Sequence, residues 1–197
     1  MKKEDLKEIR ELLVVIDMVN GFVKEGTLAA PTIMRIVPRI EKLMDYYINK
    51  VGGCVAVIRD SHTKDAVEFN TYPAHCIVGS NESELIEELK KYENDSLTYL
   101  KNSTNLVFAK GFMDDLGMMI NLQKIIFTGC LSEVCVENGA ISTKNLLDEW
   151  DRNVEVWVDA LGIDTYDAPG HDRDLITKEA LLRMERNGVK IYKKGSM

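Results

Sequence analysis

Two histidines and an aspartate give the first chemical signal in this sequence. Asp60 and His62 follow the apolar run 54–58, and His75 comes later in the same polar segment. Residues two apart in an extended strand point to the same side, so Asp60 and His62 can present an oxygen and a nitrogen together. Two imidazoles and one carboxylate leave coordination positions open, as a catalytic metal site requires. The pattern therefore predicts a metal site.

The same residues allow two other interpretations. Asp and His are also common as loop-capping groups at strand ends, so Asp60 and His62 alone would match many unrelated proteins. Cys76 directly follows His75, and its thiolate would close a structural zinc site with the two histidines and the aspartate. The segment 60–81 is long for a loop in a compact domain, and such loops are more often functional or disordered than neutral.

A candidate nucleophile lies in the segment 128–136, where a predicted strand leads into a predicted helix. Ser132 is a good N-cap, which places Cys135 in the first helical turn. Free backbone amides and the helix dipole lower the pKa of a thiol there, and a thiolate is a good nucleophile. The alternative is a buried cysteine that packs the helix onto the sheet.

Asp17 and Lys101 also stand at the ends of predicted strands. Asp17 directly follows the apolar run 12–16, where a carboxylate is costly unless it is paired or functional. An Asx turn would also explain Asp17, and a solvated strand edge would also explain Lys101. Ligands of open α/β sheets bind at the carboxyl ends of the strands. We therefore expect Asp17, Lys101 and Cys135 to meet at that edge.

Apolar runs alternate with helical patterns along the chain. Helices are predicted over 33–47, where Pro38 would cause a local distortion, and over 82–91, 132–150 and 174–186. Continuous apolar strands between helices indicate a mainly parallel sheet that is covered on both faces, which is a three-layer α/β fold. The predicted strands lie near 12–16, 54–59, 97–100, 124–128, 154–158 and 189–192.

Length and composition narrow the class of protein. The 197 residues fit a single domain over 1–197, with 1–10 as a charged extension that forms either a solvated helix or a frayed tail. A net charge of −7 argues against general nucleic-acid binding, and the apolar runs are shorter than the ~20 residues of a membrane span. No secretory signal is visible, so we expect a cytoplasmic protein. In that compartment the thiols of its four cysteines should be reduced: Cys54, Cys76, Cys130 and Cys135.

Together these motifs resemble the isochorismatase-like cysteine hydrolases, and within them the nicotinamidases. The resemblance extends from about Leu12 to Tyr192 and includes Lys101. It rests on four further segments in this order: Val15-Ile-Asp-Met-Val-Asn-Gly-Phe22, Arg59-Asp-Ser-His62, Tyr72-Pro-Ala-His-Cys76 and Gly129-Cys-Leu-Ser-Glu-Val-Cys-Val136.

The resemblance implies a fold and a set of roles. It implies a six-stranded parallel sheet in the order 3-2-1-4-5-6, with a cis peptide at Cys130–Leu131 before the nucleophile. Its catalytic triad maps onto Asp17, Lys101 and Cys135. It also implies one divalent cation, with zinc expected first and iron or manganese as alternatives; its ligands would be Asp60, His62 and His75.

The expected reaction is hydrolysis of nicotinamide to nicotinate and ammonia through a thioester on Cys135. The N–H groups of Leu131 and Cys135 would form the oxyanion hole, and three aromatic residues would wall the ring: Phe22, Tyr72 and Phe108. A small amide is the expected partner, and the oligomeric state stays open, with a homo-oligomer as one expectation.

Some features of the chain leave alternatives open. Lys110 competes with Lys101 for the role of catalytic lysine, and Ser61 and Tyr72 stand where nicotinamidases usually carry Trp. A metal-independent relative that acts on another amide or a vinyl ether, or a non-catalytic α/β binding protein, would also fit. His171 is expected to lie outside the site.

Overall fold

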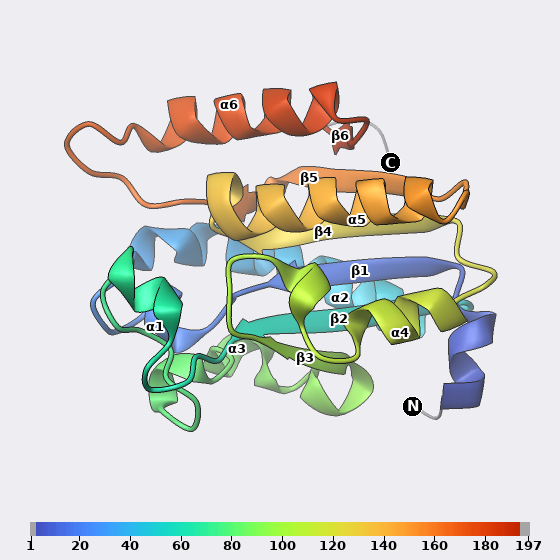
Figure 1. Ribbon diagram of the computed structural model, residues 1–197, viewed down its shortest axis with the longest axis horizontal. Coiled ribbons are helices and arrows are strands. Elements are labelled where there is room, and N and C mark those ends of the chain that lie inside the picture. The colour runs from blue at the N-terminus through green and yellow to red at the C-terminus, as the bar shows by residue number, and fades with distance from the viewer. Residues whose placement is uncertain (1–2, 194–197) are drawn as a thin grey trace.

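Six parallel strands form one sheet in the order β3-β2-β1-β4-β5-β6 (Figure 1). The structure is a computed structural model that describes residues 3–193. The strand order and parallel sheet expected from the sequence are confirmed. The strands are β1 (Glu11–Ile16), β2 (Gly53–Asp60), β3 (Leu97–Lys101), β4 (Lys124–Cys130), β5 (Glu155–Asp164) and β6 (Lys190–Tyr192).

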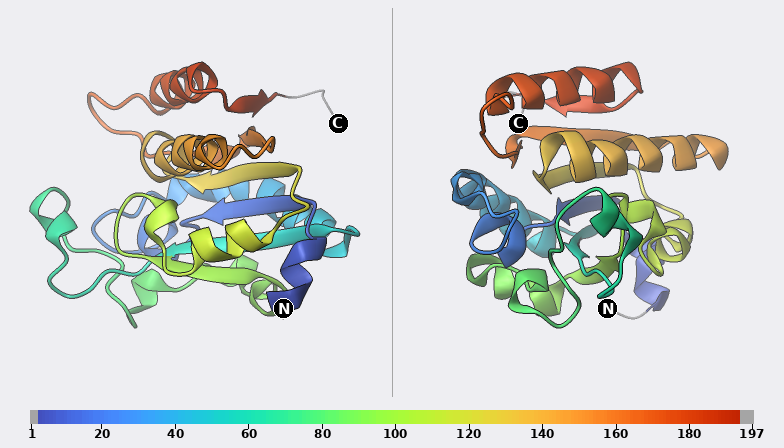
Figure 2. Two further views of the ribbon diagram at one scale, coloured as in Figure 1. Left: turned by 45° about the vertical axis from the view of Figure 1, so that its right-hand side comes forward. Right: turned by 60° about the vertical axis from the view of Figure 1, so that its left-hand side comes forward.

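Helices cover both faces of the sheet, as the alternating side chains of β1 require. Leu12 and Val14 pack in one core with residues of α4, α5 and α6, whereas Leu13 and Val15 pack in a second core with residues of α1, α2 and α3. Figures 1 and 2 show the helices on the two faces of the sheet. The three-layer α/β class is therefore confirmed. The helices are α1 (Asn20–Val23), α2 (Val37–Asn49), α3 (Glu87–Lys90), α4 (Phe112–Met118), α5 (Glu137–Glu149) and α6 (Arg173–Arg186).

The helix predicted over 33–47 differs from the prediction at its start. A 3-10 helix occupies Pro31–Ile36, and α2 begins only at Val37. Pro38 lies in the first turn of α2, where its missing N–H breaks no α-helical hydrogen bond. The expected local distortion is seen as the change from 3-10 helix to α-helix directly before it. The segment predicted as a helix over 82–91 is instead divided between the 3-10 turn Asn81–Ser83 and the single turn of α3.

Two further helix starts correct the sequence prediction. The helix predicted from Ser132 begins as a π-helix, Ser132–Val136, and its N-cap position is Leu131, where no side chain caps the helix. At the amino terminus, the 3-10 helix Lys3–Glu8 buries Leu6 in the core, so this extension is packed rather than fully solvated.

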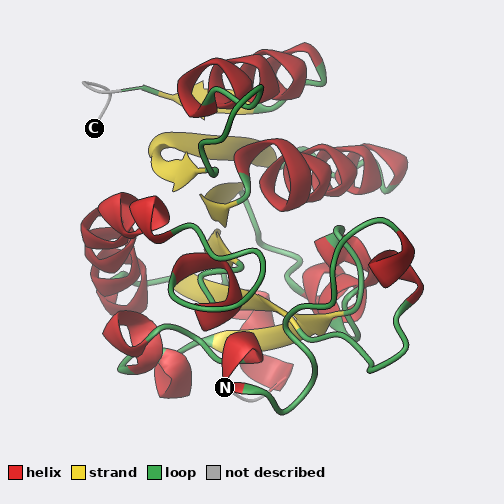
Figure 3. Cartoon of the chain, turned by 90° about the vertical axis from the view of Figure 1, so that its left-hand side faces the viewer, coloured by secondary structure: helices red, strands yellow, loops and turns green. Residues whose placement is uncertain are grey.

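The strand order reverses between β1 and β4, which leaves a crevice at the carboxyl ends of these strands. Figure 3 views the molecule from that end. Gly129 has a φ of +113°, and a Cβ atom there would lie 2.0 Å from the carbonyl oxygen of Ile16. The close approach of β4 to β1 beside the crevice therefore requires glycine. No helix in residues 3–193 is long and apolar enough to cross a bilayer.

Candidate active site

The structure brings Asp17, Lys101 and Cys135 together at this crevice. Asp17 directly follows β1, Lys101 ends β3, and Cys135 lies in the turn after β4. The Lys101 Nζ atom is 2.8 Å from Asp17 Oδ2 and 3.5 Å from Cys135 Sγ, and it also forms an ion pair with Asp60. All four side chains are buried. Three strand ends and one turn thus place an acid, an amine and a thiol in contact.

Asp17 has the surroundings of a proton acceptor. It takes a positive φ of 54°, and its Oδ1 atom accepts a hydrogen bond from the Asp60 N–H at 2.9 Å. Its Oδ2 atom has no well-directed hydrogen bond among the described residues. Burial, followed by the nearby Asp60 charge, raises the pKa of Asp17 to about 7, although Lys101 opposes this shift. A carboxyl group of this kind suits proton transfer near neutral pH.

Cys135 differs from the sequence-based expectation in its acidity. Burial raises the pKa of the Cys135 thiol well above its usual value, and Lys101 only partly offsets this. The helix start was expected to lower the pKa, but the thiol is buried in a π-turn rather than exposed at a helix end. Its burial therefore favours the neutral thiol form of Cys135.

Lys101 rather than Lys110 contacts the acid and the thiol. Burial lowers the pKa of Lys101, but the charges of Asp17 and Asp60 outweigh it, so the net pKa is well above the usual value. The two buried carboxylates therefore favour the charged form of Lys101. Lys110 is exposed on the loop before α4. Of the two candidate lysines, only Lys101 therefore lies where it could act with Asp17 and Cys135.

The three metal candidates lie together, and a fourth residue joins them. Asp60, His62, Glu68 and His75 each offer a ligand atom, and these four atoms lie within 4.8 Å of one another. Glu68 was missed in the sequence, although an acidic residue between the two histidines was an available signal. Cys76 is absent from this group, so the closed structural zinc site is wrong. Its N–H instead donates to Glu82 at 2.9 Å.

The orientation of the histidines fits a bound cation. His62 Nδ1 lies 3.1 Å from Asn102 Oδ1, and His75 Nδ1 lies 2.8 Å from the Pro73 carbonyl oxygen. These contacts leave both Nε2 atoms directed at Asp60, at 3.4 and 3.6 Å from Oδ2. The buried His62 Nε2 has no hydrogen-bond partner among the described residues. Metal-binding histidines are usually held by such contacts to the second ring nitrogen.

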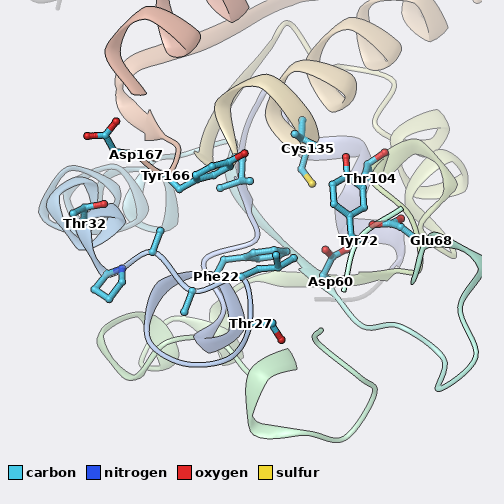
Figure 4. Close-up of a pocket in the computed structure, with 16 residues that line it drawn as sticks. Phe22, Thr27, Thr32, Asp60, Glu68, Tyr72, Thr104, Cys135, Tyr166 and Asp167 are labelled. Atoms are coloured by element: carbon cyan, nitrogen blue, oxygen red, sulfur yellow. The ribbon is translucent and has the colours of Figure 1, made fainter. Parts of the chain in front are cut away.

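A cavity of about 540 Å³ opens beside Cys135 and Asp60 (Figure 4). Phe22 and Tyr72 line it, as expected, and so does Leu131, which follows the cis Cys130–Leu131 peptide. Phe108 does not line this cavity and is 73% exposed. Its expected place in the ring wall is therefore wrong. The 3-10 turn Leu106–Phe108 buries its first two residues and leaves the third outside.

The segment after β5 supplies pocket residues that the sequence analysis missed. Tyr166 and Asp167 line the cavity, and the ring of His171 stacks on Tyr166 with a centroid distance of 3.8 Å. His171 is not part of the ligand cluster, but it supports the pocket wall, so the expectation that it lies outside the site is only partly met. No periodicity marks these residues; the Pro-Gly pair at 169–170 was the only local signal of a tight turn.

Comparisons with known proteins agree with this geometry. The isochorismatase domain model matches residues 11–182. Nicotinamidase 1 of Arabidopsis thaliana is 30% identical over 178 residues, which are 81% of this chain and 71% of that protein. Among solved structures, N-carbamoylsarcosine amidase from Thermoplasma acidophilum has a TM-score of 0.76 at 21% identity, covering 96% of this chain and 99% of that one.

The pyrazinamidase of Pyrococcus horikoshii, solved in complex with zinc, has a TM-score of 0.73 at 20% identity and covers 93% of this chain and 99% of that one. At these identities the structural likeness shows the shared fold. The family model and the Arabidopsis relative extend the relationship to the sequence. This chain belongs to the isochorismatase family of hydrolases.

Proposed function

We propose that this protein is a cysteine amidohydrolase that converts nicotinamide and water to nicotinate and ammonia. The observation that carries the proposal is the contact of Lys101 with Asp17, Asp60 and Cys135. This contact joins a nucleophile and a base to a cluster that could hold a cation. The Arabidopsis relative, which is named a nicotinamidase, supports the choice of substrate.

The reaction would begin with transfer of the Cys135 thiol proton to the Asp17 carboxylate. The sulfur then forms a bond with the amide carbonyl carbon. As the carbon–nitrogen bond breaks, Asp17 returns the proton to the departing nitrogen, which leaves as ammonia. A water molecule, giving its proton to Asp17, adds to the resulting thioester, and the acid leaves as the Cys135 thiol re-forms. Lys101 keeps the developing negative charges stable throughout.

When the sulfur bonds to the carbonyl carbon, negative charge develops on the carbonyl oxygen of the substrate. Hydrogen-bond donors in the turn before α5 would stabilise this charge. The backbone N–H groups of Leu131 and Cys135 are the proposed oxyanion hole, since Leu131 and Cys135 both line the pocket. Each such donor contributes about 3 kcal/mol to transition-state stabilisation in related chemistry.

A cation would have a positioning role in this scheme. Asp60, His62, Glu68 and His75 would hold one divalent ion, with zinc first and iron or manganese as alternatives. When bound, it would supply a Lewis-acid contact for the ring nitrogen of the substrate, either directly or through water. The zinc complex of the Pyrococcus pyrazinamidase supports this assignment.

A different small amide is the second candidate substrate. The cavity of about 540 Å³ lies within the range of pockets for drug-sized ligands, and Ser61 and Tyr72 replace the expected tryptophans. The Thermoplasma protein of similar fold is named an N-carbamoylsarcosine amidase. The same fold is therefore also found in an amidase named for a substrate without an aromatic ring.

The test is ammonia release from nicotinamide, pyrazinamide and aliphatic amides, with and without a chelator. Nicotinamide and pyrazinamide should be hydrolysed, and chelation should raise KM. Cys135→Ala should lower kcat by at least about 10⁴-fold with the metal content unchanged. Cys54→Ala, which removes a buried thiol far along β2 from the crevice, is the matched control. Turnover that survives Cys135→Ala, or no release from any amide by the metal-loaded protein, would contradict the proposal.

A further inference from the structure

The outer wall of the pocket comes from the loop that joins β5 to α6. Tyr166 is 38% exposed and lines the cavity. Figure 4 shows its ring across the pocket from Phe22 and Tyr72, with Cys135 between Tyr166 and Tyr72. The reaction scheme above assigns no role to Tyr166. Its position nevertheless places a flat aromatic face where a substrate would enter.

A tight turn holds the far side of Tyr166. In the segment Ala168-Pro-Gly-His171, proline and a glycine with a φ of +82° occupy the two central positions, which is the pattern of a type II turn. The two ends of the turn exchange backbone hydrogen bonds of 3.1 and 2.8 Å. The turn reverses the direction of the chain and brings His171 back beside Tyr166. The two rings stack with an interplanar angle of 11°.

His171 connects this wall to the turn that carries the nucleophile. Its Nε2 atom lies 3.1 Å from Glu133 Oε1, and the Thr165 hydroxyl donates to the same oxygen at 2.9 Å. The Nδ1 atom of His171 faces the Tyr166 carbonyl oxygen at 3.1 Å. Glu133 lies in the same π-turn as Cys135. The Tyr166 ring is thus fixed relative to the reacting sulfur through two side chains.

A second connection fixes the root of the loop. Arg35 donates to both carboxylate oxygens of the buried Asp164, each at 2.7 Å. Asp164 ends β5 immediately before the loop, and Arg35 lies in the 3-10 helix whose first residues, Pro31 and Thr32, also line the pocket. The two outer walls of the cavity are therefore joined to each other as well as to the nucleophile turn.

We propose that Tyr166 is a specificity-determining residue that selects carboxamides bearing a planar aromatic ring, and that His171 and Glu133 position it. Flat rings bury large area and prefer defined stacking geometries, whereas a small aliphatic amide offers no such face. A fixed tyrosine therefore stabilises a ring more than an aliphatic chain. This inference rests on the proposed amidase function and names the substrate class for it.

The experiment compares Tyr166→Ala with the unchanged protein on nicotinamide and on an aliphatic amide. KM for nicotinamide should rise about tenfold with kcat within about twofold, because stacking acts on ground state and transition state alike. KM for the aliphatic amide should not change. Tyr166→Phe, which keeps the ring, should restore KM. Tyr46→Ala, which removes an exposed tyrosine from α2, is the control.

His171→Ala separates positioning from simple folding. It should raise KM for nicotinamide by about threefold and leave kcat, the metal content and the melting temperature close to those of the unchanged protein. An unchanged nicotinamide KM in Tyr166→Ala would overturn the proposal. An equal rise for the aliphatic amide would overturn it as well.

A binding measurement distinguishes failure of this inference from failure of the amidase function. Calorimetric titration of nicotinamide and benzamide into Cys135→Ala needs no turnover. If no amide is hydrolysed, but Tyr166→Ala in the Cys135→Ala background weakens binding of the ring compounds, the amidase proposal fails and the role of Tyr166 stands. Equal binding with and without the Tyr166 ring would refute the role of Tyr166.

Discussion

The reacting groups and the wall that faces them are held in different ways. Asp17, Asp60 and Lys101 stand at the ends of buried strands and form one ion-pair network that is almost inaccessible to water. Tyr166 belongs to a surface loop and is held by a turn and a few polar contacts. The difference indicates that the arrangement of the buried groups depends on the balance of their charges. The contribution of the loop wall depends on the shape and position of the Tyr166 ring.

Charge balance makes the first region intolerant of substitution. Lys101 is the cation between two buried carboxylates, and removing one partner of such a set leaves uncompensated buried charge. The pKa of Asp60 shows the same dependence, because burial alone would raise it and the Lys101 charge brings it below its usual value. Substitutions here should affect folding and turnover together, while those in the loop wall should affect substrate binding alone.

The largest effect is expected for Lys101→Met. The variant should lose turnover, and its free energy of unfolding should fall by about 3 kcal/mol because a buried ion-pair partner is lost. Urea denaturation followed by circular dichroism measures the stability, and ammonia release measures the activity. Lys110→Met, at an exposed position of the same chain, should match the unchanged protein in both. An active Lys101→Met would show that charge balance is not what this region requires.

A smaller effect is expected for Glu68→Gln in the candidate cation cluster. The substitution keeps the size of the side chain but removes its charge, so the affinity for zinc should fall at least about tenfold. Competition with a chromogenic chelator measures this affinity without reference to activity. Asp65→Asn, in an exposed part of the same loop, provides the control. Equal zinc affinity in the two variants would remove Glu68 from the ligand set.

The smallest effects separate true pocket walls from exposed aromatic residues. Phe22→Leu keeps an apolar side chain at a position that is 4% exposed, and it should raise KM for nicotinamide about threefold through loss of ring contact. Phe108→Leu should leave KM unchanged, because Phe108 is 73% exposed and does not line the cavity. Steady-state kinetics of the Phe22→Leu and Phe108→Leu variants measures which of the two rings contacts the substrate. A rise in KM for Phe108→Leu would restore it to the ring wall.

The parts of the site that could be predicted from sequence are those fixed by strands. Asp17, Asp60 and Lys101 follow or end apolar runs, and parallel strands bring their carboxyl ends to one edge. Their convergence therefore follows from the strand pattern, and the resemblance supplied their roles. Cys135 was placed correctly, but the direction of its pKa shift was not, because a helix start in sequence does not reveal how deeply the thiol is buried.

The parts that could not be predicted depend on the path of loops. Glu68 reaches the cluster, Phe108 turns outward and Tyr166 turns inward, and each outcome depends on contacts between residues far apart in sequence. The hydrogen bond between His171 and Glu133 spans 38 positions, and that between Arg35 and Asp164 spans 129. Local periodicity carries no information about such contacts, so the groups at the strand ends were predictable and these loop positions were not.

The position of the ion pair between Arg35 and Asp164 has a consequence for how this chain could diversify. It anchors the base of the β5–α6 segment independently of the eight residues that follow, 165–172. Exchange of those residues for the equivalent segment of a related hydrolase would therefore change the outer wall of the pocket, while the ion pair between Arg35 and Asp164 still holds its base.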